Sequence, residues 1–472
     1  MSSFFAEDFL LDTATARRLY HGCAAALPII DWHCHLSAKE LAENLRYNNL
    51  SQAWLGADHY KWRAMRCCGV DERLITGEAE DLEKLRAFAA CMPRLAGNPL
   101  YAWTHLELKG FFGIGQPLSP ATADEIYSRA SDGLQKMPVR TLLLKSNVKL
   151  ICTTDDPADT LEYHERLAQE YAEGEFPVRV LPAFRTDAVL CIEKPGYAAY
   201  LKKLGGCAGT EIRGLEELKA ALRSRMDYFQ AHGCRAADQS FTSVPKLFAG
   251  ESEMERLLQK ALRGEEIGAS EAEGFRGSML LFLAEEYAKR AWGMELHMGP
   301  IRNANTALFK QLGADAGGDI TGESLDIQAL AGLLDKLNES NSLPNTVLFS
   351  LNPNDNAALC ALCGAFGGRV RQGSAWWFND SLNGMLEQLT TYASMLPLGE
   401  FLGFVTDSRS YLSYPRHEYF RRLLCALLGK WAESGEYAAD MAALRELVKA
   451  VCVGNCMEFF GFDELEQEVH NG

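Results

Sequence analysis

Ten residues near the N-terminus, 27–36 with the sequence LPIIDWHCHL, constrain the fold more than any other stretch. An apolar run leads into Asp31, His33 and His35, which is typical of a short buried strand that ends in polar side chains. Alternate side chains of a strand point to the same face, so these three groups are expected on one side. Two imidazoles at this spacing can bind one divalent metal ion, and the alternative is a pair of exposed or core histidines.

The second half of the pattern is a series of further short apolar segments with helical segments between them. Most of them are bounded by turn residues, and they cover 148–156, 176–187, 233–239, 294–299, 345–353, 369–378 and 400–408. Together with the first strand they make eight. Eight strands that alternate with helices predict an α/β fold, a closed (β/α)₈ TIM-type barrel. The length of 472 residues fits one such barrel with insertions.

A long stretch after the first strand interrupts this alternation. Residues 37–140 have apolar positions at helical period and no convincing strand pattern, which predicts a large helical insertion, a subdomain or lid. The predicted organisation is therefore an N-terminal helical cap with the first strand (1–36), the insertion (37–140) and the rest of the barrel with C-terminal helices (141–472).

Charge and cysteine content limit the partners and the compartment. The net charge of −16 disfavours nucleic acid and anionic membranes, so an anionic substrate would need locally placed arginines. No apolar run is long enough to span a bilayer and no signal segment is evident, which predicts a cytoplasmic protein. The 14 cysteines, with Cys360 and Cys363 as a lone CxxC, are interpreted as reduced thiols.

Polar residues collect where the predicted strands end, which is where a barrel of this type carries its active site. These residues are His33, His35, Thr153, Thr154, Asp155, Asp156, Arg185, Asp187, Asp238, Gln239, His297, Asn352, Asn354, Trp376, Trp377, Asn379, Asp380, Asp407 and Arg409. Such a concentration at one end predicts a catalytic site there.

The order of these residues resembles a known superfamily. An HxH pair on the first strand, a histidine on the fifth and an aspartate on the eighth are the pattern of the amidohydrolase superfamily. The segments DWHCHL, CTTDDP, LPAFRTD, LHMGPIRNAN, GSAWWFNDS and FLGFVTDSRSYLSYPRHEYFRR further resemble one branch, the uronate isomerase family. The resemblance covers nearly the whole chain. It implies the isomerisation of D-glucuronate to D-fructuronate and of D-galacturonate to D-tagaturonate.

The resemblance also implies a metal centre and a catalytic set. His33, His35 and Asp407 match the family's metal ligands, for one divalent ion per chain with zinc as the expected metal, and His297 lies close by as a ligand or proton carrier. Tyr60 matches the catalytic tyrosine. Because a tyrosine has a pKa of about 10, it needs a nearby cation to act as a base. Arg409 could supply that cation or could instead hydrogen-bond the developing oxyanion. Asp407 is a second candidate for the proton transfer.

Substrate contacts are predicted for His59, Arg185, Arg302, Trp377 and Asp380. The arginines suit the substrate carboxylate, or else form structural ion pairs, for Arg185 with Asp187 or Asp238. His59 and the tryptophan suit a sugar face or hydroxyl, or else pack in the protein.

Two positions depart from the family pattern, without touching the metal or catalytic residues. Gln239 stands where relatives commonly have histidine, and Pro415 stands where they often have threonine in SYTRHEYFRR, which is interpreted as a loop variation.

Two other functions remain as alternatives. One is a metal-dependent hydrolase of the same superfamily, which acts on an amide or ester. The other is a non-catalytic uronate-binding barrel, which would be expected to have a broken ligand set. The predicted partner is a small uronic acid, without nucleic acid or membrane, and a homo-oligomer is expected.

Overall fold

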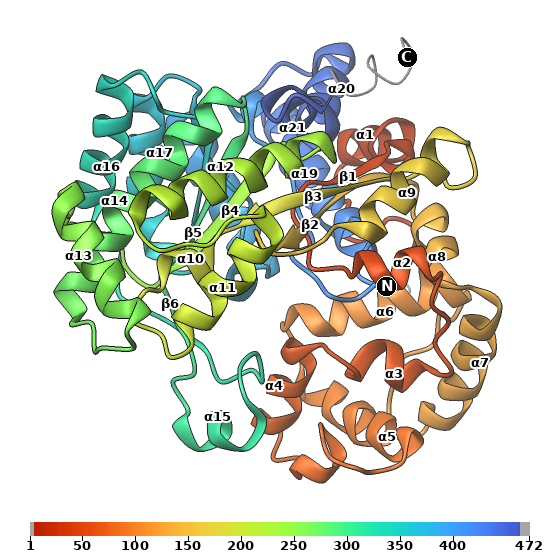
Figure 1. The fold of residues 1–472 in the computed structure, drawn as a ribbon. Coiled ribbons are helices and arrows are strands. Elements are labelled where there is room, and N and C mark those ends of the chain that lie inside the picture. The colour runs from red at the N-terminus through yellow and green to blue at the C-terminus, as the bar shows by residue number, and fades with distance from the viewer. Residues whose placement is uncertain (1–3, 463–472) are drawn as a thin grey trace.

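The computed structural model describes residues 4–462, and a curled parallel sheet lies at its centre (Figure 1). Seven strands pair in the order β1-β2-β3-β4-β5-β8-β9, and each pair is parallel. They are β1 (Ile29–Asp31), β2 (Val148–Asp155), β3 (Arg179–Arg185), β4 (Ala236–Phe241), β5 (Gly293–Met298), β8 (Thr346–Ser350) and β9 (Val370–Gln372). Seven of the eight predicted strands are therefore present, in a half-barrel of the TIM type.

The eighth predicted strand, 400–408, is the part of the barrel prediction that is wrong. Within the described residues 401–408 no strand forms, although the segment runs beside the end of β1. The Asp407 amide donates to the His33 carbonyl at 3.3 Å, and Ser408 accepts from the His35 amide at 3.0 Å. Positive φ angles at Gly403 (79°) and Asp407 (44°) interrupt the extended backbone, so a regular ladder cannot form.

Helices cover the outer face of the sheet (Figure 1). They are α9 (Glu162–Ala172), α10 (Asp187–Leu190), α11 (Tyr197–Ala208), α12 (Leu215–Ala231), α13 (Glu251–Leu262), α14 (Ala269–Lys289), α16 (Ile327–Glu339), α17 (Asn356–Ala365) and α18 (Leu382–Met395). Strand alternation separates two cores. On β5, Leu296 packs in the core under these helices, and its neighbours Glu295 and His297 are buried outside that core.

The predicted helical insertion is present between β1 and β2. It consists of α2 (Ala38–Ala42), α3 (Leu50–Leu55), α4 (His59–Cys67), α5 (Asp81–Cys91), α6 (Pro99–Phe112), α7 (Ala123–Lys136) and α8 (Val139–Lys145). Its apolar core is continuous with that of the terminal helices α1 (Ala14–Gly22) and α19 (Pro415–Ser434). The chain then ends its described part with α20 (Met441–Lys449) and α21 (Asn455–Phe459). None of the helices in residues 4–462 is long and apolar enough to cross a membrane.

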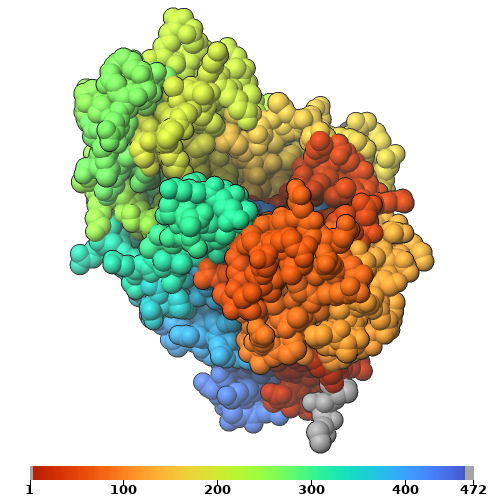
Figure 2. Space-filling view, turned by 90° about the horizontal axis from the view of Figure 1, so that it is seen from below, coloured from red at the N-terminus to blue at the C-terminus, as the bar shows by residue number. Residues whose placement is uncertain are grey.

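A second excursion, which the sequence pattern did not predict, follows β5. Residues 299–322 contain the short antiparallel pair β6 (Pro300–Ile301) and β7 (Ile320–Thr321), with α15 (Thr306–Leu312) between them. In Figure 1 this excursion projects from the barrel to the side of α4. Figure 2 shows its teal atoms against the orange insertion, with a hollow at their junction.

Candidate active site

A cavity of about 890 Å³ opens at the C-terminal ends of the strands, below the insertion and the 299–322 excursion. Most of the predicted site residues line it, namely His33, His35, His59, Tyr60, Arg185, His297, Arg302, Trp377, Asp407 and Arg409. The strand ends, the helical insertion and the 299–322 excursion thus contribute to a single cavity. Asp380 is the predicted substrate contact that is not part of its lining.

Two imidazoles and one carboxylate converge on the cavity at the end of β1. Nε2 of His33 and Nε2 of His35 lie 3.3 Å and 3.0 Å from the same oxygen, Oδ1 of Asp407. The donor atoms of the three residues lie within 4.8 Å of one another, which is the spacing of a metal-binding group. Nitrogen and carboxylate donors suit Zn²⁺ or a similar divalent ion, so this set fits the predicted metal.

Neighbouring polar groups fix two of these side chains. Oγ1 of Thr154, at the end of β2, lies 2.7 Å from Nδ1 of His35, which leaves Nε2 free to face Asp407. The indole N–H of Trp376 donates to Oδ2 of Asp407 at 2.7 Å, so Oδ1 is the oxygen turned to the imidazoles. Asp407 itself has φ 44°, a conformation that non-glycine residues seldom adopt and that often marks functional sites.

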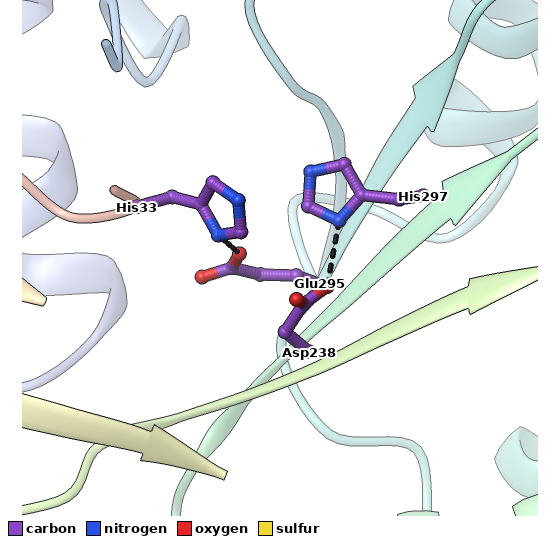
Figure 3. Close-up of side chains that lie close together, drawn as sticks. All are labelled: His33, Asp238, Glu295 and His297. Carbon is purple, nitrogen blue, oxygen red and sulfur yellow. Dashed lines mark hydrogen bonds and ion pairs between the residues drawn. The ribbon is translucent and has the colours of Figure 1, made fainter. Parts of the chain in front are cut away.

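A pair of buried groups, Asp238 on β4 and His297 on β5, lies beside His33 (Figure 3). Both side chains project from the interior faces of their strands. Nδ1 of His297 lies 2.7 Å from Asp238, whose other oxygen accepts a 2.7 Å hydrogen bond from Arg185. The ring centroids of His297 and His33 are 4.5 Å apart. Nε2 of His297 is buried and has no hydrogen-bond partner among the described residues. Since Nδ1 faces a carboxylate, Nε2 is the nitrogen that would carry the lone pair in the neutral imidazole.

The charges around the centre shift its pKa values in different directions. Burial lowers the pKa of His35 to about 4. Burial would also lower the pKa of His33, but Glu295 and Asp407 raise it well above its usual value. Burial opposes ionisation of Asp407, yet hydrogen bonds from both imidazoles hold its pKa well below its usual value. Asp407 is therefore ionised and His35 is neutral, which are the forms in which these side chains can bind a metal ion.

Helix α4 supplies the wall opposite the metal ligands. Asp58 caps it by accepting from the amides of Tyr60 and Lys61 at 2.9 and 3.2 Å, and the cap places His59 and Tyr60 in the first turn. Burial raises the pKa of Tyr60 well above its usual value, and Asp380 raises it further. The Tyr60 hydroxyl is buried without a hydrogen-bond partner within residues 4–462. Tyr60 is thus a protonated phenol in this structure.

The expectation that Arg409 lowers the pKa of Tyr60 is not met. Arg409 donates to Asp315 of the excursion at 2.9 Å and lies 3.5 Å from Nδ1 of His59. The cation over the Tyr60 ring is Arg416, 5.6 Å from the ring centroid, and its effect is smaller than that of burial. Arg409 instead joins the 299–322 excursion to the barrel.

The two predicted carboxylate-binding arginines differ in their surroundings. Arg185 contacts two carboxylates, Asp238 at 2.7 Å and Asp187 at 3.0 Å, as the structural alternative predicted. Arg302 contacts one carboxylate, Asp319 at 2.9 Å, and lies 5.1 Å from the Trp377 ring centroid. Arg302 therefore keeps more free donors for a ligand.

Two smaller expectations, for Asp380 and Pro415, need correction, and the structure also places Gln239. Asp380 is buried, with a pKa that burial raises well above its usual value, and it acts on Tyr60 from outside the cavity lining. Gln239 points to the helix layer, where its amide donates to the Tyr287 hydroxyl at 2.9 Å, so a side chain at this position faces away from the site. Pro415 lies in the first turn of α19, where proline is tolerated, and is not a loop residue.

Three residues contact the candidate metal ligands, namely Thr154, Trp376 and Glu295. The sequence placed Thr154 and Trp376 at the strand ends without this contact, and it gave Glu295 no role. For Glu295 a signal was available, since it precedes His297 by two positions on a strand and must share its face. Its Oε2 lies 2.7 Å from Nδ1 of His33 (Figure 3). For Trp376 the signal was absent, because its bond to Asp407 joins two irregular segments.

The curled parallel sheet, with histidine and carboxylate donors at its strand ends, defines an enzyme of the metal-binding (β/α)₈ class. The glucuronate isomerase family model matches residues 1–460. A uronate isomerase of Caldicellulosiruptor saccharolyticus is 45% identical over 98% of this chain and 100% of its own length. The chain belongs to the glucuronate isomerase family, which confirms the isomerase prediction over the hydrolase alternative.

Solved structures agree with this assignment. The uronate isomerase of Thermotoga maritima superposes with a TM-score of 0.92 and 35% identity, covering 97% of this chain and 100% of that one. The glucuronate isomerase of Caulobacter crescentus gives a TM-score of 0.89 and 26% identity, covering 97% of both chains. The fold is therefore shared over nearly the whole length, insertion included.

Proposed function

We propose that the enzyme interconverts D-glucuronate with D-fructuronate, and D-galacturonate with D-tagaturonate, by moving a proton between C2 and C1 through an enediol(ate). One observation carries this proposal. The donor atoms of His33, His35 and Asp407 converge on one wall of an 890 Å³ cavity, and Tyr60 faces it from another wall. An aldose–ketose shift needs an electrophile for the carbonyl oxygen, a proton acceptor and a proton donor around one small substrate.

His33, His35 and Asp407 would hold one divalent ion, proposed to be Zn²⁺, which when bound polarises the substrate's carbonyl oxygen. His297 is the proposed proton carrier and not a ligand. Its Nδ1 faces the ionised Asp238, whose pKa Arg185 holds low against the effect of burial. Its unpartnered Nε2 is therefore ready to accept a proton from the sugar, and Asp407 remains the alternative acceptor.

Tyr60 is the proposed proton donor at the sugar oxygens. Its raised pKa keeps the hydroxyl protonated, and that hydroxyl is buried without a partner in the described part of the chain. A phenol in such a place can donate to an oxyanion as it forms, without first breaking a bond to the protein. His59, the preceding residue on α4, lines the cavity and is positioned for a sugar hydroxyl.

Arg302 is the proposed clamp for the C6 carboxylate, with Trp377 as the wall below it. Its contact with one carboxylate leaves guanidinium donors for a second, whereas Arg185 already contacts two. Arg409 adds a second cation on the same wall. These cations offset the net charge of −16, which would otherwise repel an anionic sugar at long range.

The experiment follows zinc-loaded enzyme with D-glucuronate in D₂O by NMR. We expect the ketose product, its loss on treatment with a chelator, and its return when Zn²⁺ is added. Deuterium at C2 of recovered aldose reports how far the carried proton exchanges with solvent. D-glucose is the matched control, because it differs only in having CH₂OH in place of the C6 carboxylate, and it should turn over far more slowly. Absence of ketose from both glucuronate and galacturonate contradicts the proposal.

We propose further that the enzyme is a cytoplasmic homo-oligomer. All 14 cysteines are free thiols, a state that a reducing compartment maintains. Exposed apolar side chains support self-association, and they include Leu144, Leu247, Ile301, Phe309, Ile320 and Met395. Light scattering coupled to size exclusion tests the oligomer, since a monomer mass at micromolar concentration contradicts it.

A further inference from the structure

Glu295 is a buried carboxylate with a single basic neighbour. It lies on β5 facing the barrel interior and is fully buried. Its Oε2 is 2.7 Å from Nδ1 of His33, but the contact is not linear, and neither oxygen has an aligned hydrogen-bond partner among the described residues. A buried polar group needs a neighbour to hydrogen-bond with, and His33 is the side chain within reach of Glu295.

We infer that Glu295 is a positioning residue for the metal centre. By facing Nδ1 of His33 it favours the tautomer with the proton on Nδ1, and this leaves the lone pair on Nε2, next to Asp407 and His35. The close-up in Figure 3 shows this carboxylate beside the His33 ring, joined to it by a dashed line, whereas His297 faces Asp238. Glu295 would act on the ion through His33, and one of its own oxygens also lies within 4.8 Å of donor atoms of His33, Asp238 and His297.

The two ligand imidazoles have unequal support. Nδ1 of His35 faces the neutral hydroxyl of Thr154 at 2.7 Å, whereas Nδ1 of His33 faces a carboxylate at 2.7 Å. The nearby pair of Asp238 and His297 has a cation of its own, because Arg185 contacts Asp238 at 2.7 Å. Within residues 4–462, Glu295 has no ion pair with an arginine or a lysine, so His33 is the basic side chain that it can orient.

That contact orients a ligand of the proposed ion. With Nδ1 of His33 held at 2.7 Å from Oε2 of Glu295, Nε2 of the same ring is directed to Oδ1 of Asp407, 3.3 Å away. Removal of such an outer partner typically weakens metal binding, so Glu295 should raise the affinity for a divalent ion by orienting His33.

The test measures Zn²⁺ affinity by competition with a chromophoric chelator, without any uronate. We expect Glu295→Gln, which keeps an oxygen near Nδ1 but removes the charge, to bind Zn²⁺ about 10- to 100-fold more weakly. Glu295→Leu, which removes both, should bind still more weakly. The matched control is Glu107→Gln in α6, since Glu107 is equally buried and accepts from the Trp54 indole at 2.6 Å. Its Zn²⁺ affinity should stay that of the wild type.

A spectroscopic readout separates positioning from general loss of structure. With Co²⁺ as the probe, the visible absorption of the bound ion should change in Glu295→Gln and not in Glu107→Gln. Only the first substitution alters the side chain that orients the ligand His33. Wild-type Zn²⁺ affinity in Glu295→Leu, folded by circular dichroism, overturns the inference. If that variant does not fold, wild-type affinity and Co²⁺ spectrum in Glu295→Gln overturn it. The inference rests on the proposed metal ligands, but a wild-type protein that binds zinc without isomerising uronates would refute only the proposed reaction.

Discussion

The two walls of the cavity are held in place by different kinds of interaction. The wall that carries the proposed metal ligands adjoins the sheet. His33 and His35 follow β1 directly, and Asp31 accepts from the amide and hydroxyl of Thr406 at 2.8 and 2.6 Å, which ties β1 to the segment that carries Asp407. The opposite wall comes from two excursions that pair through side chains.

Those side-chain contacts link α4 to the 299–322 excursion. Arg63 donates to the Asp319 carbonyl at 2.6 Å and to Gly317 at 3.4 Å, and Arg66 donates to the Ala316 carbonyl. Hydrogen bonds from arginine to loop carbonyls open more easily than a parallel sheet with a packed core. The comparison indicates a fixed wall at the proposed metal site and an adaptable wall over the proposed sugar site.

The largest effect should follow from breaking the fixed wall. His35→Asn removes one of the two imidazoles that face Asp407, so the ion is lost and the rate of uronate isomerisation should fall on the order of 10³-fold or more. Zinc content measured together with turnover checks this. Near-normal turnover in a variant that retains no metal would contradict the division between the walls.

The next effect should come from Tyr60 on the adaptable wall. Tyr60→Phe removes the proposed donor, and kcat should fall about 10²- to 10⁴-fold, which is typical for loss of general acid–base catalysis. Zinc affinity should not change, because Tyr60 is not among the metal-binding group. Tyr127→Phe in α7, outside the cavity lining, is the matched control and should keep full activity. Loss of zinc in Tyr60→Phe would show that the walls are not independent.

A smaller effect should follow from loosening the contact between the two excursions. Arg63 does not line the cavity, yet Arg63→Ala removes its hydrogen bonds to the 317–319 carbonyls. We expect KM for D-glucuronate to rise about tenfold, as loss of a charged hydrogen bond predicts, with kcat and zinc content nearly unchanged. Arg94→Ala removes a similar bond, to the Cys68 carbonyl, elsewhere in the insertion and should leave KM as it is. Equal KM values in the two variants would contradict an adaptable wall.

The same division explains what the sequence could predict. Strand alternation and the position of strand ends are local properties, so His33, His35 and Asp407 could be brought together before the structure was known. Asp407 was placed correctly even though its segment is not a strand, because the resemblance to a family does not depend on regular hydrogen bonding. Glu295 could have been found from its spacing to His297.

The adaptable wall could not be predicted in this way. The contact between α4 and residues 299–322 joins segments about 250 positions apart. Its arginines donate to backbone carbonyls, so no acidic side chain in the excursion marks them as partners in the sequence. Arg409 likewise donates to Asp315, which lies on the 299–322 excursion. The excursion has no helical or strand periodicity from which this contact could be predicted. Residues whose neighbours come from irregular segments, such as Trp376, were missed for the same reason.

The smallest expected effect concerns histidines that support a wall without binding an ion. His105 on α6 lies 2.6 Å from the Tyr101 carbonyl through Nδ1, and its Nε2 accepts from the Leu118 amide at 2.9 Å, so it must be neutral. Burial lowers the pKa of His105 to about 4. Its unfolded pKa is near 6.5, so the unfolded chain takes up the proton first, and stability falls as the pH decreases from about 6.5 towards 4. Between pH 7 and pH 5.5 this residue should lower the free energy of unfolding by about 1 kcal/mol.

Denaturant unfolding of wild type and His105→Gln at both pH values measures the difference. The variant will be less stable throughout, but its stability should depend less on pH by that amount. An unchanged pH dependence would mean that acid acts on other groups first, and that the insertion is no more sensitive to acid than the sheet.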